Sequence, residues 1–179
     1  MGRVYEHVAA LLRDVSREAR VTIEVGCGSC QYAPSVPGLY VGLDRAEHYH
    51  GGRADVKGDA RALPFGEGVA DLVFMVATLC IMPGGAGALA EAHRVLRPGG
   101  RLVVFDYSWW SARPSRVNYH TSMSLARRLR GLGMVPRIHW TCAPGWGPGW
   151  LRRLSNAKGI RLATYLAGSW VIVSGTKRG

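Results

Sequence analysis

Carboxylates are missing from the last part of this 179-residue sequence, where none follows Asp106. Residues 1–106 carry 11 Lys and Arg against 12 Asp and Glu, whereas residues 107–179 carry the other 12 basic residues and no acid. All six Trp residues also lie in this second part. A basic segment rich in aromatics is typical of proteins that bind a polyanion. A solvated basic surface above core tryptophans is the simpler alternative.

Long apolar runs are also missing. The longest nearly pure one covers 72–82, and a membrane span needs about 20 residues, so this run predicts a buried core segment. The N-terminal segment contains Glu6, Asp14 and Glu18 and lacks the apolar stretch of a signal peptide. We therefore expect a cytoplasmic protein with one domain over residues 1–179.

Cysteine is scarce, with four residues in the chain. Cys27 and Cys30 have the spacing of a metal-binding or redox pair, but no second pair follows, so we expect no metal site. Cys80 and Cys142 are expected to be buried thiols, although a hyperthermophile could bridge them. The His48-Tyr49-His50 segment has no third ligand nearby and is interpreted as a solvated loop.

Apolar and β-branched segments alternate with stripes of helical spacing, which predicts an α/β fold with a mostly parallel sheet. Helices are expected at 3–19, 89–96 and 125–132. Strands are expected at 21–25, 39–43, 54–57, 71–76, 101–106, 135–141 and 169–174.

Three expected strands end in residues suited to a nucleotide-like ligand. Gly26 and Gly28 follow the first strand and allow a sharp turn close to a ligand. Asp44 ends the second strand and can accept hydrogen bonds from ribose hydroxyls. Asp59, past the third strand, can accept from an adenine amino group, with the Ala60 amide beside it.

Two further positions refine the type of ligand. Glu24 lies below the glycine turn, where a carboxylate suits the cationic amino acid end of a ligand. A dinucleotide dehydrogenase would prefer Gly at position 31, and Gln31 stands there instead.

Together these segments resemble class I S-adenosylmethionine-dependent methyltransferases, especially the quinone-biosynthesis and small generic types. The matching stretches are IEVGCGSC (23–30), VGLDRA (41–46), GDARALPF (58–65), ADLVFMVATLCIM (70–82) and LAEAHRVLRPGGRLVVFDY (89–107). The resemblance implies a Rossmann-like sheet of seven strands, mostly parallel with the last antiparallel, and helices on both faces. It also implies S-adenosylmethionine as cofactor, bound by Glu24, Gly26, Cys27, Gly28, Asp44, Arg45, Asp59, Ala60, Ala77 and Thr78.

Departures from the family predict a compact variant. Pro34 and Pro37 leave little room for a long helix after the first strand, and the next crossover is reduced to residues 46–50. Only one helix precedes the first strand, so the helix that often covers the site in this family is missing here. An uncovered site would accommodate a large acceptor.

Methyl transfer is an in-line displacement, so a base is needed only when the acceptor must lose a proton early. The candidates are Asp106 and Tyr107, at the carboxyl end of the fifth strand, and His120 on the following loop. Asp106 is equally well explained as a structural carboxylate at a strand end. Asp71 begins its strand at the opposite edge and is expected to be structural.

The family topology places the loops at 107–121 and 142–168, the latter an insertion, around the methyl group. Their basic and aromatic residues predict an anionic acceptor, with RNA as the leading candidate. The predicted acceptor-binding residues are Trp109, Trp110, Arg113, Arg116, Trp146, Trp150, Arg152 and Arg153. A small-molecule acceptor and a cofactor-binding interaction module without turnover stay open as alternatives.

Overall fold

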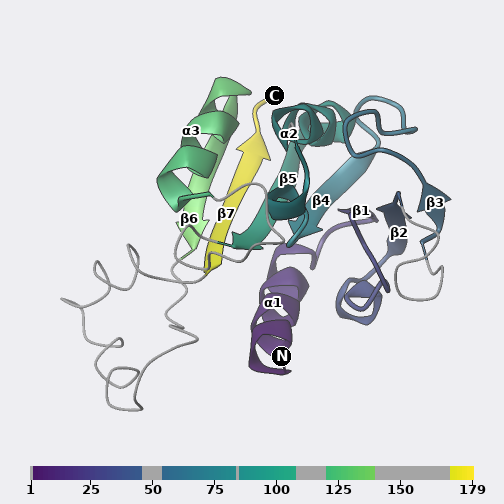
Figure 1. Ribbon diagram of the computed structural model, residues 1–179. Coiled ribbons are helices and arrows are strands. Elements are labelled where there is room, and N and C mark those ends of the chain that lie inside the picture. Colours follow the sequence, from purple (N-terminus) through teal and green to yellow (C-terminus); the bar gives the residue numbers. More distant parts are fainter. Residues whose placement is uncertain (1, 46–53, 84, 108–119, 140–169) are drawn as a thin grey trace, which may run out of the picture.

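The computed structural model describes residues 2–45, 54–83, 85–107, 120–139 and 170–179 (Figure 1). Its seven-stranded sheet has the order β3-β2-β1-β4-β5-β7-β6. The strands are β1 (Val21–Val25), β2 (Leu39–Asp44), β3 (Val56–Lys57), β4 (Ala70–Val76), β5 (Leu96–Tyr107), β6 (Met134–His139) and β7 (Trp170–Lys177). β7 runs antiparallel to both of its neighbours, β5 and β6, and the other pairs of neighbouring strands are parallel. The predicted mostly parallel Rossmann-like sheet is confirmed.

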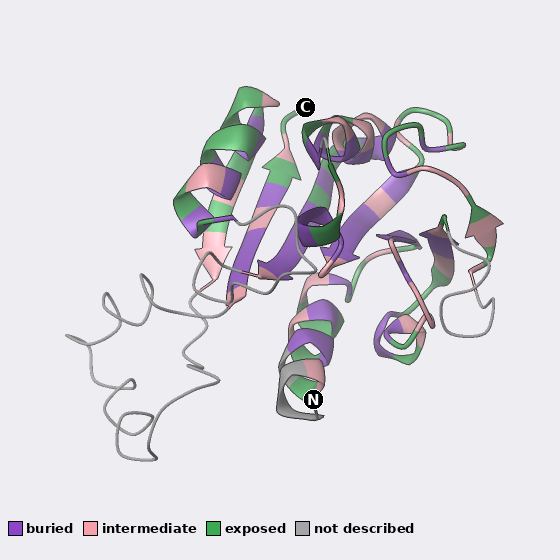
Figure 2. Cartoon of the chain, in the orientation of Figure 1, coloured by how far each residue is buried: buried purple, intermediate pink, exposed green. Residues whose placement is uncertain are grey.

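Helices cover both faces of the sheet, as expected. One core cluster joins β1, β4 and β5 to α2 (Gly85–Val95) and α3 (Ser122–Gly131). A second cluster, on the other face, packs α1 (Gly2–Val15) and the residues that flank the 3₁₀ turn η1 (Ala33–Ser35) against β4, β5 and β7. Figure 2 shows the central strands of the described chain as largely buried. Within β4, Leu72 and Phe74 belong to one cluster and Val73 and Met75 to the other, which explains its unbroken apolar sequence.

The observed bounds of most helices and strands agree closely with those expected from the sequence, with a few differences. Pro34 is accommodated in η1, so a single 3₁₀ turn follows the first strand where a long helix is usual. Helix α1 ends at Val15 rather than residue 19, and β3 has two residues rather than four.

The expected start of the fifth strand at residue 101 was wrong. Strand β5 begins at Leu96 and includes Pro98-Gly99-Gly100. Leu96 pairs with Ala70, and the register then shifts before Arg101 pairs with Leu72. The Pro-Gly-Gly segment therefore ends the helix but is absorbed as an irregularity at the start of the strand.

The strand order determines where a ligand can bind. β1 lies between β2 and β4. The chain first extends the sheet on one side of β1, through β2 and β3, and then returns to the other side of β1 to form β4. Loops after the carboxyl ends of these strands diverge at such a point and leave a crevice. No helix among the described residues is long and apolar enough to cross a bilayer.

Candidate functional site

A cavity of about 440 Å³ lies at the carboxyl ends of β1, β2 and β4. Its lining residues are Gly26, Gly28, Leu43, Asp44, Arg45, Gly58, Ala60, Arg61, Ala77, Thr78, Ile81, Met82 and Pro83. Seven of the predicted cofactor-binding residues are therefore brought together here, and Glu24, Cys27 and Asp59 are not among the lining residues.

Asp44 connects the end of β2 to the glycine loop after β1. Its Oδ2 accepts a hydrogen bond from the Gly28 amide at 2.8 Å, and its Oδ1 accepts from the Arg45 amide at 2.6 Å. The amides of Gly26 and Cys27 donate to the Leu43 carbonyl, at 2.8 and 3.1 Å. The carboxylate is thus fixed at the cavity wall, and each of its oxygens can accept more than one hydrogen bond.

Gly26 is required by both its backbone conformation and its surroundings. Its φ is +75°, and a Cβ atom would lie 2.5 Å from both Cγ2 and Oγ1 of Thr78. Thr78 cannot easily move, because its hydroxyl donates to the carbonyls of Val25 and Val76, at 3.1 and 3.2 Å. Glycine at position 26 therefore lets the loop pack directly against Thr78, and its backbone lines the cavity.

Glu24 lies beneath the loop, as expected, but its carboxyl group contacts the protein rather than the cavity. It is 1% exposed and accepts a hydrogen bond from the Tyr40 hydroxyl. Burial raises the pKa of Glu24 to about 8, against the lowering effect of the Tyr40 hydrogen bond. Near neutral pH this side chain is mostly protonated, so the expected contact with a cationic ligand group stays a prediction.

Asp59 is engaged by its own loop. Its Oδ1 accepts from the Arg61 amide at 2.8 Å, and the Arg61 guanidinium bonds both carboxylate oxygens. The Arg61 side chain, together with that amide, holds the pKa of Asp59 well below its usual range. Its neighbours Ala60 and Arg61 line the cavity instead. The predicted contact of Asp59 with an adenine amino group is not tested by this arrangement.

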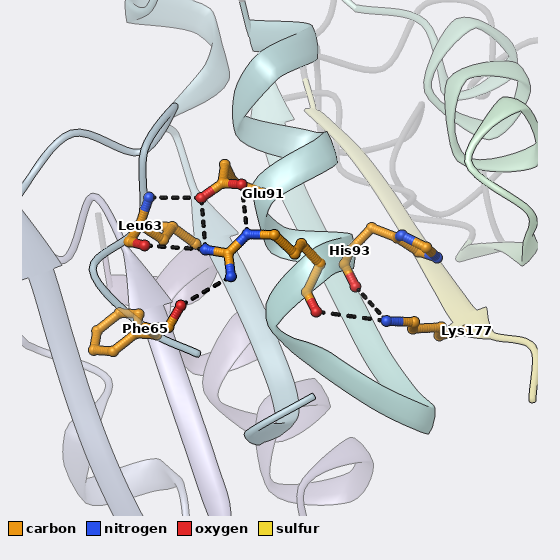
Figure 3. A network of polar contacts seen from close by, with 6 residues as sticks. Leu63, Phe65, Glu91, His93 and Lys177 are labelled. Atoms are coloured by element: carbon orange, nitrogen blue, oxygen red, sulfur yellow. Dashed lines mark hydrogen bonds and ion pairs between the residues drawn. The ribbon is translucent and has the colours of Figure 1, made fainter. Parts of the chain in front are cut away.

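A polar network holds the loop that follows Asp59 against α2 (Figure 3). Glu91 Oε2 accepts from the Leu63 amide at 2.8 Å and pairs with Arg94. Arg94 in turn donates to the carbonyls of Leu63 and Phe65, at 3.0 and 2.9 Å. Beyond it, Lys177 Nζ donates to the carbonyls of His93 and Leu96, at 3.0 and 2.8 Å. The cavity wall at 58–61 is thus anchored indirectly to α2.

The catalytic candidate Asp106 is fully buried and does not line the cavity. Its Oδ2 accepts from the Cys80 amide at 3.0 Å and its Oδ1 accepts from the Tyr107 amide at 2.7 Å. Burial raises the pKa of Asp106 to about 6. These contacts fix η2 (Leu79–Ile81), the turn that follows β4, and favour the structural role that the sequence left open.

Of the other two catalytic candidates, Tyr107 lies at the end of β5 and His120 lies beside η2. The Tyr107 ring lies 3.7 Å from the Trp170 ring, centroid to centroid. His120 is 4% exposed, hydrogen-bonds the backbone of Leu79, and has no partner for Nε2 among the described residues. Burial lowers the pKa of His120, so it is neutral near pH 7. Neither residue lines the cavity, and their catalytic roles stay predictions.

The predicted acceptor-binding residues lie outside the described residues, in 108–119 and 140–169. So do the shortened crossover at 46–50, the His48-Tyr49-His50 segment and Cys142. In the part of the chain that is described, no group of three or more His, Cys, Asp or Glu side chains could hold a metal ion.

Sequence reasoning missed several lining residues: Leu43, Gly58, Arg61, Ile81, Met82 and Pro83. All but Pro83 lie within the motif stretches quoted above. The sequence could have indicated these residues only by their position beside a motif carboxylate or a strand end, and not by the chemistry of their side chains.

The comparisons with known proteins agree with this geometry. Residues 23–104 match the family described as methyltransferase domain. Residues 23–104 therefore carry the sequence pattern of a methyltransferase domain. S-adenosylmethionine, the cofactor expected from the resemblance, agrees with this family match.

Two curated relatives share parts of the domain. The ubiquinone/menaquinone biosynthesis C-methyltransferase of Paracoccus denitrificans is 40% identical over 108 residues, covering 56% of this chain and 38% of that protein. The sterol 24-C-methyltransferase of Pneumocystis carinii is 31% identical over 122 residues, covering 59% of this chain and 32% of that protein. The chain therefore spans about a third of the length of these relatives.

A solved structure agrees over nearly the whole chain. Geranyl diphosphate C-methyltransferase from Streptomyces coelicolor, in complex with S-adenosyl-L-homocysteine, superposes with a TM-score of 0.72 at 19% identity. The match covers 99% of this chain and 82% of that one. At this identity it establishes that the methyltransferase domain has the same fold.

Proposed function

We propose that this chain binds S-adenosylmethionine in the cavity described above and transfers its methyl group to a small, largely apolar acceptor. The observation that carries the proposal is the contact between Asp44 and the Gly28 amide at the crossover point of the sheet. It places a fixed carboxylate, which can accept hydrogen bonds from ribose hydroxyls, beside exposed backbone that the group attached to the ribose can approach closely.

Each wall of the cavity suits a different part of the cofactor. Asp44 would accept hydrogen bonds from the ribose hydroxyls. Glycine at position 26 lets the loop pack on Thr78 without a clash, and its backbone lines the part of the cavity where the amino acid portion would lie. Leu43, Ala60 and Met82 offer apolar contacts for the flat base. The residues present therefore fit the group.

The cofactor supplies an electrophilic methyl group on a sulfonium when it is bound. The chain's own contribution is alignment, because an in-line displacement gains most from holding the reactants in position. Asp106 contributes to this alignment because its carboxylate accepts hydrogen bonds from the amides of Cys80 and Tyr107. These bonds fix the turn after β4 relative to the end of β5.

The apolar character of the acceptor is supported by the rim of the cavity. Ile81 is 61% exposed, and it lines the cavity with Met82 and Pro83 directly after η2. An exposed large apolar side chain at a cavity mouth favours an apolar partner. The relatives named above are methyltransferases of quinone, sterol and geranyl diphosphate chemistry, which agrees with such an acceptor.

An anionic acceptor such as RNA is the second candidate. Arg127, Arg128 and Arg130 are charged residues on the exposed side of α3, and Arg137 follows on β6. No Asp or Glu lies anywhere in 107–179 to oppose a phosphate. We place either reaction in the cytoplasm, where protein thiols are reduced except for transient regulatory disulfides.

A radiolabelled transfer assay distinguishes the acceptor classes. The wild type and D44A are incubated with S-adenosylmethionine carrying a labelled methyl group and with separate lipid, small-molecule, RNA and protein fractions of a cell extract. We expect label in the lipid or small-molecule fraction with the wild type alone. Label confined to RNA, with incorporation falling steeply as salt rises, would replace the apolar acceptor by the anionic one. Binding without any transfer would favour an interaction module.

A further inference from the structure

Two reduced cysteines lie within the glycine loop that the proposed function assigns to the cofactor. The Sγ atoms of Cys27 and Cys30 are 3.3 Å apart, and neither residue is in a disulfide. The Cys30 amide donates to the Cys27 carbonyl at 2.9 Å, which closes a turn and brings the two side chains together. The pair was noted in the sequence for its spacing, and cofactor binding does not require two thiols.

The surroundings hold the two sulfurs close to each other. They rest on the backbone of Gly42 in β2, where a Cβ atom would lie 2.7 Å from Cys30 Sγ and 3.0 Å from Cys27 Sγ. Tyr40 Oη would lie 3.1 Å from the same Cβ position. Cys30 also has a φ of 54°, a conformation that favours glycine. A side chain at position 42 would therefore displace the two sulfurs.

We propose that Cys27 and Cys30 form an oxidation site, in which a low-molecular-weight disulfide converts the dithiol into an intramolecular disulfide that weakens cofactor binding. The inference rests on the proposed function, because the loop is assigned to the cofactor there. Cys30, the more exposed of the two, provides the thiolate that attacks first.

The exchange balances in two steps. The Cys30 thiolate attacks one sulfur of the small disulfide, which forms a mixed disulfide and releases one small thiol. The Cys27 thiolate then attacks Cys30 Sγ, which forms the protein disulfide and releases the second small thiol. The two protons of the protein thiols end on the two released thiols, and the small disulfide accepts both electrons. Burial raises the pKa of the Cys27 thiol, so less of the thiolate that the second step needs is present at a given pH.

The new bond would disturb the contact on which cofactor binding depends. The sulfurs must approach from 3.3 Å to about 2.05 Å. Gly28 lies inside the contracted turn, and its amide is the donor to Asp44 at 2.8 Å. Shortening the turn therefore shifts the amide relative to the carboxylate. By linkage, a bound cofactor protects the dithiol from oxidation to the same degree that oxidation weakens binding.

The test compares the full chain after treatment with oxidised glutathione and after treatment with dithiothreitol. Tryptic cleavage releases residues 21–45 as one peptide that holds Cys27 and Cys30 but neither of the other cysteines. We expect this peptide to lose two hydrogens on oxidation. Affinity for S-adenosylhomocysteine should fall by roughly tenfold, which is typical of coupled sites. Dithiothreitol should restore both properties.

Two variants complete the test. C30S cannot form the bond and should bind S-adenosylhomocysteine equally after both treatments. C30G serves the same purpose with a residue suited to the φ of 54°, should C30S fail to fold. A peptide that stays reduced, or a disulfide that leaves the affinity unchanged, would overturn the inference. A reduced wild type that fails to bind would instead contradict the proposed function, which the peptide mass distinguishes.

Discussion

Gly26 and Thr78 are in direct contact, and a methyl group on Gly26 would lie 2.5 Å from two atoms of the Thr78 side chain. The contact joins the loop after β1 to the end of β4, the two strands that flank the crossover point. Thr78 is 5% exposed, and its hydroxyl donates to a backbone carbonyl in each of these strands. The cavity floor therefore has a fixed shape before any ligand binds.

A substitution of Gly26 tests this contact. G26A should lose affinity for S-adenosylhomocysteine and lower the free energy of unfolding through both its φ of +75° and the clash. G133A is the matched control, because Gly133 has a φ of +80° and nothing within 4 Å of its Cβ position. The control should cost about 1–2 kcal/mol for the left-handed conformation alone. Overpacking should add about 1–3 kcal/mol in G26A. Equal costs in chemical denaturation would show that Thr78 yields.

The network around Arg94 should control cofactor affinity from outside the cavity. R94A removes the donors to the carbonyls of Leu63 and Phe65, which frees the loop that carries Ala60 and Arg61. We expect a lower melting temperature and weaker binding of S-adenosylhomocysteine. R17A is the control, since Arg17 forms an exposed pair with Asp14 on α1. If R94A melts lower but binds as tightly as the wild type, the loop does not depend on this anchor.

Glu24 should make the stability of the chain depend on pH. Burial raises its pKa from 4.5 to about 8, so between these values the folded chain keeps a proton that the unfolded chain has released. The contribution of Glu24 to stability is therefore fully present below pH 4.5 and falls as the pH rises toward 8. E24Q lacks this titration, and its melting temperature relative to the wild type should rise over that range. The histidines with lowered pKa act in the opposite direction in both proteins, so the difference isolates Glu24. A constant difference would contradict the assignment.

Much of the fold could be predicted because its elements are locally encoded. The unbroken apolar run of β4 predicted burial on both faces, and the two core clusters confirm it. Pro34 predicted the loss of a helix after β1, and only η1 forms there. The start of β5 could not be predicted, because Pro98-Gly99-Gly100 has the composition of a turn and the strand begins before it only through the pairing of Leu96 with Ala70 in β4.

The site was predictable to the extent that it depends on strand ends. Asp44 ends β2 and Gly28 follows β1, and these two strands are parallel neighbours, so the proximity of the two residues follows from the topology. The capture of Asp59 by Arg61 and of Glu24 by Tyr40 depends on side-chain geometry that no spacing reveals. The same holds for Ile81, whose exposure at the cavity follows from the η2 turn that Asp106 fixes.

The most direct test of the cofactor assignment is a calorimetric titration of S-adenosylhomocysteine into the wild type, D44A and D14A. D14A removes an exposed carboxylate of α1 and controls for the change in charge. The wild type and D14A should bind one equivalent with micromolar affinity. D44A should bind roughly 100-fold more weakly, since each hydrogen bond to a charged group contributes about 1.5–3 kcal/mol. A wild type that does not bind, or a D44A variant that binds as tightly as the wild type, would contradict the assignment of this cavity to the cofactor.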